Sequence, residues 1–274
     1  MIRIKNTVTK EEQIITPTIF PDGTSQVWKI GIEKYIYNHV MVIWNFENEA
    51  ELIHLIQLIH LLGSYNIVVM ELYIPYFPYS RQDKNISDTT TFAKRVFVDL
   101  LAELPSVYEI TSLDIHSDIA TRYKKSYSAI QYVNKAIDDF NPTVLVFPDA
   151  GAHTRYSHYS GFSTFDCIVL DKDREQSSGN IGDLKINEEK TKLSSKYIGL
   201  EDRMLIIDDI CDGGATFIKA SKFLHDKYKC KIGLYVTHGI FSKGKDIILD
   251  SGIEKIYTTQ SLIKNTEGFE LNEF

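Results

Sequence analysis

The chain has 274 residues, of which 43% are hydrophobic and 24% are charged, a composition typical of a soluble globular protein. Its formal net charge of −7 argues against a general nucleic-acid-binding surface. No apolar run approaches the roughly 20 residues of a membrane-spanning helix, and the N-terminal stretch lacks the apolar core of a signal peptide. We therefore expect a cytoplasmic protein that binds neither nucleic acid nor membrane.

Short apolar runs alternate with helical patterns along the whole chain, which predicts α/β architecture with largely parallel sheets and right-handed crossovers. The Pro-Asp-Gly turn at 21–23 predicts a hairpin, and the polar stretch 176–196 predicts a mobile excursion. The expected strands are 40–44, 67–74, 107–113, 144–147, 167–170, 204–207, 232–236 and 255–258. The expected helices are 49–62, 88–104, 132–140, a short one with Arg155, one beginning at Thr216, and 246–249.

Polar residues follow several of these strands directly. In open α/β sheets ligands bind at the carboxyl ends of the strands, so residues far apart in sequence can converge there. Taken singly, such residues are more often capping or locally hydrogen-bonded groups, and only the joint pattern predicts a site. The residues concerned are Arg81, His116, Asp149, Lys172, Asp208, Asp209 and His238.

The stretch 204–216 combines a buried strand, an acidic turn rich in small residues, and a helix start. Asp208 and Asp209 end the apolar run, and Asp212 opens the turn Gly213-Gly214-Ala215 before Thr216. Turn amides at a helix N-terminus suit a phosphate, and carboxylates suit ribose hydroxyls or hydrated magnesium. The alternative is an ordinary turn with an aspartate cap, although three neighbouring acids repel one another unless something binds them.

This stretch resembles the phosphoribosyl diphosphate (PRPP) loop of the type I phosphoribosyltransferase fold, where two acids precede an Asp-Thr-Gly-Gly-Thr turn. Here the first Thr is Gly213 and the second Gly is Ala215. A longer set of motifs resembles the ribose-phosphate diphosphokinases, or PRPP synthetases. These motifs are Phe-Pro-Asp-Gly at 20–23, Pro-Tyr-Phe-Pro-Tyr-Ser-Arg-Gln-Asp-Lys at 75–84, Asp-Ile-His at 114–116, Pro-Asp-Ala-Gly at 148–151, Lys-Asp-Arg at 172–174 and Val-Thr-His-Gly-Ile-Phe-Ser-Lys-Gly at 236–244.

The resemblance implies two similar phosphoribosyltransferase-like halves, at 1–135 and 136–274, which form two domains or one continuous unit. It also assigns roles to residues. Lys172 and Arg174 would be catalytic. His116 and Asp149 would hold magnesium. ATP would be bound by Phe20, Asp22, Arg81, Gln82, Asp83, Lys84 and His116, and the sugar phosphate by Asp208, Asp209, Asp212, Gly213, Gly214, Ala215 and Thr216.

The activity that the resemblance implies is magnesium-dependent transfer of a diphosphoryl group from ATP to ribose 5-phosphate, giving PRPP for nucleotide biosynthesis. Two alternatives remain open: the same reaction on ADP-ribose in NAD salvage, and a non-catalytic partner that regulates a true synthetase. In the family the turn at 20–23 reaches the adenine of a neighbouring subunit, which implies a homo-oligomer, a dimer or a hexamer.

Overall fold

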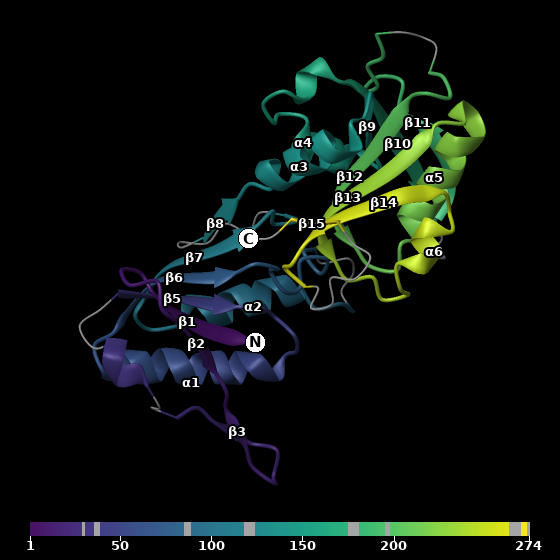
Figure 1. The fold of residues 1–274 in the computed structure, drawn as a ribbon. Helices are drawn as coiled ribbons and strands as arrows, with labels where there is room; N and C mark the ends of the chain where they lie inside the picture. Colours follow the sequence, from purple (N-terminus) through teal and green to yellow (C-terminus); the bar gives the residue numbers. More distant parts are fainter. Residues whose placement is uncertain are drawn as a thin grey trace. The chain divides into compact units, whose positions relative to one another are not determined.

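The computed structural model describes residues 1–28, 31–35, 39–84, 89–117, 124–174, 181–194, 198–262 and 270–272. The chain divides into two compact units, unit 1 from Met1 to Ser128 and unit 2 from Ala129 to Phe274 (Figure 1). Each unit has its own sheet and its own hydrophobic core. Helix α3 (Ile130–Phe140), which a boundary between residues 135 and 136 would cut, lies wholly in unit 2.

Unit 1 contains a six-stranded sheet in the order β2-β1-β5-β6-β7-β8. The strands β5 (His39–Trp44), β6 (Val68–Ile74), β7 (Val107–Leu113) and β8 (Lys124–Tyr127) are parallel. The strands β1 (Ile2–Asn6) and β2 (Glu12–Ile15) add an antiparallel edge. A separate hairpin of β3 (Thr18–Ile19) and β4 (Ser25–Gln26) extends away from this sheet (Figure 1).

The core of unit 1 lies between the sheet and the helices α1 (Ala50–Ser64) and α2 (Ala93–Ala102). Leu55, Leu58, Ile59 and Leu62 recur at helical spacing along α1, and all four are fully buried. Burying such a side chain contributes about 1.5–3 kcal/mol, so this stripe fixes the helix against the sheet. A short 3₁₀ helix, η1 (Ile32–Tyr35), precedes β5.

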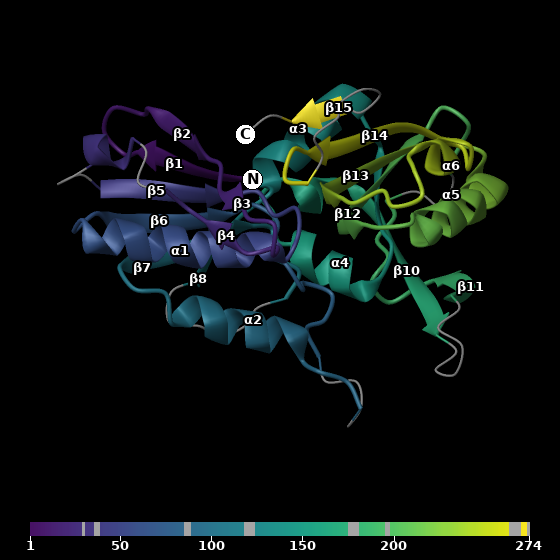
Figure 2. The same cartoon turned by 90° about the horizontal axis from the view of Figure 1, so that it is seen from below.

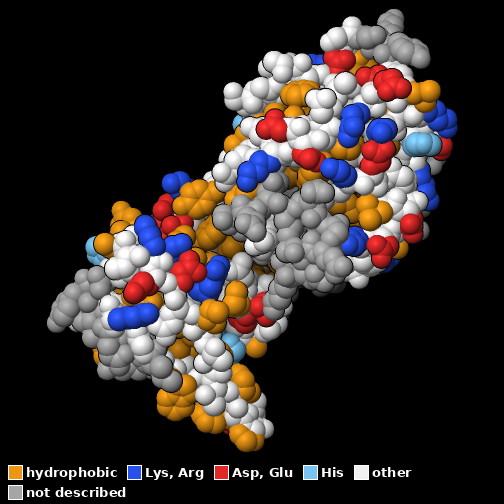
Figure 3. All heavy atoms as spheres, viewed as in Figure 1, with side chains coloured by type: hydrophobic (Ala, Val, Ile, Leu, Met, Phe, Trp, Pro, Cys, Tyr) orange, Lys and Arg blue, Asp and Glu red, His pale blue; other side chains and the backbone are white. Residues whose placement is uncertain are grey.

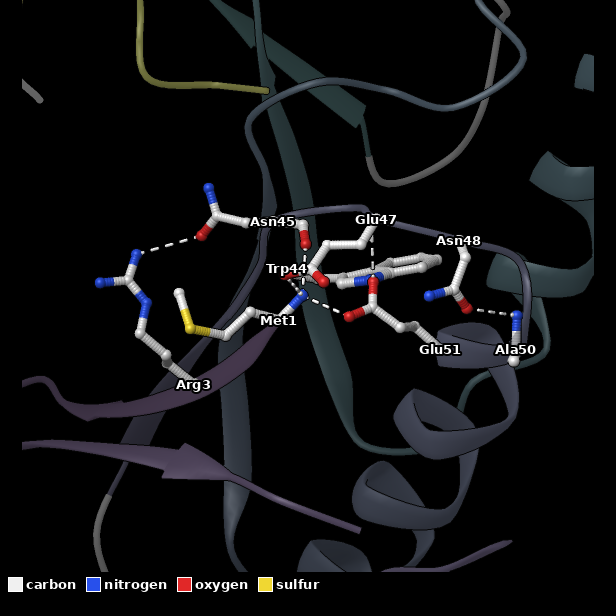
Figure 4. Close-up of polar contacts among 8 residues, drawn as sticks. All are labelled: Met1, Arg3, Trp44, Asn45, Glu47, Asn48, Ala50 and Glu51. Carbon is white, nitrogen blue, oxygen red and sulfur yellow. Dashed lines mark hydrogen bonds and ion pairs between the residues drawn. The ribbon is translucent and has the colours of Figure 1, made fainter. Parts of the chain in front are cut away.

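The first turn of α1 is tied to the end of β5 by a buried carboxylate (Figure 4). Glu51 accepts hydrogen bonds from the Trp44 indole nitrogen and from the Glu47 amide, both at 2.9 Å, and from the amino group of Met1. Hydrogen bonds to a charged group contribute about 1.5–3 kcal/mol each. This network therefore fixes the turn between β5 and α1.

Unit 2 contains a seven-stranded sheet in the order β11-β10-β9-β12-β13-β14-β15. All neighbouring pairs are parallel except β10 and β11. The strands are β9 (Val144–Phe147), β10 (Asp166–Arg174), β11 (Ile181–Ile186), β12 (Arg203–Cys211), β13 (Lys231–Gly239), β14 (Ile253–Thr259) and β15 (Glu270–Asn272).

Helices cover both faces of the unit 2 sheet, with α3 and α4 (Ala150–Tyr156) on one side and α5 (Ala215–Tyr228) and α6 (Asp246–Leu249) on the other (Figures 1 and 2). A second 3₁₀ helix, η2 (Phe162–Thr164), precedes β10. The central strands have nearly continuous buried runs, as expected for parallel strands with helices on both faces. Gly233 allows the Phe140 ring to lie close to β13, because a Cβ there would approach the ring to 3.0 Å.

The structure confirms the α/β class with two largely parallel sheets, and it confirms the hairpin at the Pro-Asp-Gly turn. Several strands are longer than expected, so Asp208, Asp209, Lys172 and His238 belong to strand ends rather than to the turns that follow them. The apolar runs marked only the buried centres of these strands.

Two expectations about secondary structure were wrong within the described residues, and three strands were not anticipated. Helix α2 begins at Ala93, after non-helical residues 89–92, because Phe92 has a ψ of 76°. The stretch 176–196 contains β11, which pairs with β10, and Lys192 forms a bridge with Cys167. The strands β1, β2 and β8 had no predicted counterpart, since their partners, and not a strong local pattern, define them. No helix in the described ranges is long and apolar enough to cross a membrane.

Candidate active site

The strand order of unit 2 reverses between β9 and β12. The chain leaves β9 for β10 on one side, whereas β12 pairs with the opposite side of β9. Such a topological switch point is where open α/β sheets bind ligands, beyond the carboxyl ends of the strands. Asp149 follows β9, and Asp208 and Asp209 lie near the end of β12. The topology therefore brings three of the predicted site residues to this point.

The carboxylates at the switch point interact strongly with one another. Burial raises the pKa of Asp208 well above its usual range, and the nearby charges of Asp209 and Asp149 raise it further. Asp209 is buried, and its Oδ2 lies 3.5 Å from Nη2 of Arg155 on α4. The Asp209 amide donates to Oδ1 of Asp208 at 2.9 Å. A ligand that brings hydroxyl donors or a cation would relieve this crowding of negative charge.

Asp149 and Arg155 reach the switch point because of how α4 begins. Asp149 is the N-cap of α4, and its Oδ1 accepts a hydrogen bond from the Ala152 amide at 2.9 Å. Arg155 lies in the last turn of the same helix. The sequence indicated a short helix with Arg155 but assigned this arginine no role. Its pairing with Asp209 depends on the packing of α4 beside β12.

The turn 212–216 connects β12 to α5 in the predicted form of strand, turn and helix. Gly214 is the N-cap of α5 with φ = 76°, a conformation that L-residues rarely adopt, and α5 begins at Ala215. A Cβ on Gly214 would lie 2.7 Å from Cγ1 of Ile248, so glycine also permits close packing against α6. The first turn of α5, with Thr216 half-buried, presents main-chain N–H groups at its N-terminus.

The turn after β13 packs against the acidic turn. Ser242 donates a hydrogen bond to Oδ1 of Asp212 at 2.6 Å. The aliphatic stem of Lys243 lies over Gly213, where a Cβ would come within 3.4 Å of its Cδ and Cε. Lys243 itself is exposed. Sequence reasoning missed this lysine, although it stands between Ser242 and Gly244 in a motif that the family writes as Ser-Gly.

His238 differs from the expectation that it joins the ligand crevice. Its side chain is buried in β13, and its Nδ1 lies 2.7 Å from Oγ of Ser261. Ser261 in turn donates to the Thr237 carbonyl at 3.3 Å. His238 thus connects β13 to the residues after β14, which is a structural role.

Lys172 and Arg174, the predicted catalytic cations, lie at the end of β10, where the pairing with β11 shifts register. Their backbone positions are described, and their side chains fall outside the described part. Asn187 fastens the far end of β11 to β10, because its Nδ2 donates to both carboxylate oxygens of Asp171 at 3.0 and 3.2 Å. The predicted cations are therefore carried on a paired two-stranded arm.

In unit 1 the segment 75–84 is held by its aromatic residues. The rings of Phe77 and Tyr79 each lie 5.3 Å from the ring of Phe97 on α2. Tyr79, which has a φ of 59°, also donates to Glu49 at 2.6 Å, and these contacts raise the pKa of Tyr79 to about 12. This buried anchor leaves the end of the segment accessible, where Arg81, Gln82 and Lys84 are exposed and Asp83 is half-buried.

The other two predicted ATP-binding motifs also lie in unit 1. His116 is half-buried in the turn after β7, which begins at Asp114 with a φ of 41°. Phe20 and Asp22 lie at the tip of the hairpin, and both are exposed. The side-chain and backbone groups of Thr24 donate to Oδ1 of Asp22 at 2.7 and 3.0 Å, and these hydrogen bonds lower the pKa of Asp22. Thr24 therefore fixes the conformation of this turn.

The predicted magnesium ligands are not brought together within one unit, since His116 belongs to unit 1 and Asp149 to unit 2. Among the described residues no group of three or more His, Cys, Asp or Glu side chains has the geometry to hold a metal. Magnesium usually keeps several waters and binds one or two carboxylates plus substrate phosphates. The crowded carboxylates of Asp149, Asp208 and Asp209 fit that donor chemistry.

The sequence is similar to those of several ribose-phosphate pyrophosphokinases. The chain is 24% identical over 228 residues to a ribose-phosphate pyrophosphokinase of Thermoplasma acidophilum, covering 81% of this chain and 75% of that protein. It is 27% identical over 200 residues to ribose-phosphate pyrophosphokinase 2 of Schizosaccharomyces pombe, covering 69% of this chain and 59% of that protein. No protein-family model matches the chain.

The fold is similar to the crystal structure of phosphoribosylpyrophosphate synthetase from Mycobacterium smegmatis, with a TM-score of 0.75 and 17% identity over 95% of this chain and 85% of that one. Two α/β units, one with an acidic turn at its switch point, define a protein of the phosphoribosyltransferase-like fold class. Within that class the chain is similar to the ribose-phosphate pyrophosphokinases.

Proposed function

We propose that the chain transfers the diphosphoryl group of ATP to the anomeric hydroxyl of ribose 5-phosphate, giving PRPP and AMP. The observation that supports this most is the acidic turn at the switch point of unit 2, in a chain whose relatives are named ribose-phosphate pyrophosphokinases. The segment 75–84 adds to it, because exposed polar residues stand on a buried aromatic anchor. An enzyme that uses PRPP without making it would not need a second, ATP-binding segment.

The chemistry asks mainly for positioning and charge stabilisation, because attack at the β-phosphorus crowds negative charge at the reaction centre. In this proposal Arg81 binds phosphate oxygens in a forked geometry, with Gln82, Asp83, Lys84 and the hairpin residues Phe20 and Asp22 completing ATP recognition. Lys172 and Arg174 stabilise the charge that develops on the transferring group.

The acceptor binds at the switch point in the same proposal. Asp208 and Asp209 accept hydrogen bonds from the ribose hydroxyls, which orients the anomeric oxygen. These bonds also relieve the repulsion from Asp209 and Asp149, which adds to burial in raising the pKa of Asp208. The turn 212–216 binds the 5′-phosphate through its amides and through Thr216. In this proposal His116 and Asp149 would help to hold magnesium, which would supply positive charge to neutralise the phosphates.

The altered turn bears on the choice of acceptor. Gly213 lacks the hydroxyl that the family's threonine offers, which would weaken binding of a terminal dianion. The aliphatic stem of Lys243 lies over that glycine, and in this proposal its ammonium group supplies a cation to the 5′-phosphate. We therefore favour ribose 5-phosphate over ADP-ribose, whose phosphates carry about one charge each.

The deciding experiment measures AMP release with ATP and magnesium, using ribose 5-phosphate and ADP-ribose as acceptors at matched concentrations. A higher kcat/KM with ribose 5-phosphate supports the proposal. A preference of tenfold or more for ADP-ribose, about 1.4 kcal/mol, would replace the acceptor and place the protein in NAD salvage. No AMP release with either acceptor would favour a non-catalytic regulatory partner.

We also propose that the protein works as a homo-oligomer. The hairpin presents exposed apolar side chains, with Ile19 58%, Phe20 41% and Trp28 49% exposed (Figure 3). A second copy would bury them and place Phe20 beside a neighbouring ATP segment. Sedimentation at assay concentrations should show a dimer or hexamer, and a fully active monomer would contradict this arrangement.

A further inference from the structure

Lys94, in the first turn of α2, is fully buried. Lysine is among the residues that are least often buried, since removing an ammonium group from water costs several kcal/mol unless it is hydrogen-bonded. Its neighbour on the same helix, Arg95, has the ordinary behaviour, because it is exposed and pairs with Asp99. The burial of Lys94 therefore requires a specific explanation.

The side chain of Lys94 reaches the turn after β7. Its Nζ donates to the carbonyl oxygen of Ser117 at 2.5 Å and contacts Oγ of the same residue at 2.9 Å. Ser117 follows His116 directly in the chain. The turn is fixed on its other side by β8, because the Asp114 amide donates to the Tyr127 carbonyl at 2.9 Å.

The main chain of Lys94 reaches a different motif. Its amide donates to the carbonyl oxygen of Gln82 at 3.2 Å, and its Nζ lies 5.9 Å from the centre of the Phe77 ring. The start of that segment is fastened to β7, since the Leu113 amide donates to the Pro75 carbonyl at 3.2 Å. Lys94 thus joins the end of the segment 75–84 to the turn that carries His116.

We propose that Lys94 is a positioning residue that fixes the distance between the polar end of the segment 75–84 and His116, and so shapes the ATP site. The inference rests on the proposed function, which assigns both motifs to ATP. Lys94 acts through Ser117 and Gln82 without touching the nucleotide. Small displacements of positioned groups can lower rates by two orders of magnitude, so its loss should be visible in catalysis.

The test compares Lys94→Met with Arg95→Met. Methionine keeps the length and burial of the side chain and removes the donor. Because it no longer brings an ammonium group into the interior, the desolvation cost that it avoids offsets the loss of the hydrogen bonds to Ser117. We expect Lys94→Met to stay folded, to lower kcat/KM for ATP at least about thirtyfold, and to leave KM for ribose 5-phosphate within about twofold. Arg95→Met removes an exposed cation from the same helix and should match the wild type.

Two further measurements separate positioning from mere stability. Hydrogen exchange at the Asp114 and Ile115 amides should become at least tenfold faster in Lys94→Met while the β6 amides keep their protection. Aminoethylation of Lys94→Cys restores an ammonium at nearly the same distance. Carried out on the unfolded chain before refolding, in a background where Cys167, Cys211 and Cys230 are replaced by alanine, it should recover the ATP kinetics of that background. Unchanged exchange in the turn, or ATP kinetics equal to those of Arg95→Met, would overturn the proposal.

A failure of the proposed function would look different. It would appear in the wild type, as no AMP release with either acceptor. Calorimetric binding of magnesium–ATP to the wild type and to Lys94→Met would then decide the role of Lys94. Equal affinities in the two proteins, or no binding to either, would overturn it.

Discussion

Replacement of Gly214 by alanine tests the packing of the acidic turn. Two effects add at this position. The φ of 76° places an L-residue in the left-handed region, which costs about 1–2 kcal/mol. The added Cβ would lie 2.7 Å from Cγ1 of the fully buried Ile248, and overpacking of this kind costs about 1–3 kcal/mol. We expect Gly214→Ala to destabilise unit 2 by roughly 2–5 kcal/mol.

Gly213→Ala is the matched control. The φ of Gly213 lies outside the left-handed region, and its added Cβ would meet Lys243 at 3.4 Å, an ordinary van der Waals contact. The change should alter stability by less than about 1 kcal/mol. In an Ile248→Ala background, Gly214→Ala should keep only the conformational cost, since the clash is then removed.

Native-state hydrogen exchange of the β12 and α5 amides measures these effects in unit 2 alone. Urea unfolding followed by tryptophan fluorescence would not serve, because both tryptophans, Trp28 and Trp44, lie in unit 1. Equal losses for Gly213→Ala and Gly214→Ala would refute the argument from φ and packing. A loss for Gly214→Ala that persists unchanged without the Ile248 side chain would refute the steric part.

Three other outcomes are expected. Lys172→Ala or Arg174→Ala should lower kcat by about 10²–10³ with a much smaller change in ATP affinity. Near-normal turnover in both variants would show that the catalytic cations are not these two residues at the end of β10. Lys243→Met should raise KM for ribose 5-phosphate about tenfold or more, the cost of one charged hydrogen bond. An unchanged KM would show that Lys243 does not bind the acceptor. Burial and then the Glu71 carboxylate raise the pKa of Tyr127 to about 12. The stability from its neutral phenol should therefore be lost as pH rises from about 10 through 12. The difference in absorbance at 295 nm between wild type and Tyr127→Phe should titrate near 12, and Glu71→Gln should lower that midpoint.

Local patterns in the sequence determined the class of the fold and the centres of most elements. The stripe of α1, the four-residue run of β9 and the turn at 21–23 each combine an unambiguous period or turn chemistry with a buried face. The order of motifs also indicated which residues to examine at the ends of strands.

Only the tertiary structure determined where the strands end and which polar residues belong to them. Asp208 and Asp209 extend β12, and Lys172 and Arg174 extend β10, because neighbouring strands supply hydrogen bonds to polar residues that have no strand pattern of their own. The antiparallel partner β11 was missed for the same reason. The sequence suggested that His238 faces a ligand, whereas its side chain is buried and hydrogen-bonded to Ser261, beyond the end of β14.

Packing between distant segments also determines which partners the basic residues near the predicted motifs contact. Arg155 pairs with Asp209, Lys243 covers Gly213, and Lys94 joins two motifs. A lysine or arginine on a short helix or turn gives no local sign of which distant group it will meet. A sequence pattern indicates which face of a helix or strand is buried. The group that a charged side chain contacts depends instead on how segments far apart in the chain pack together.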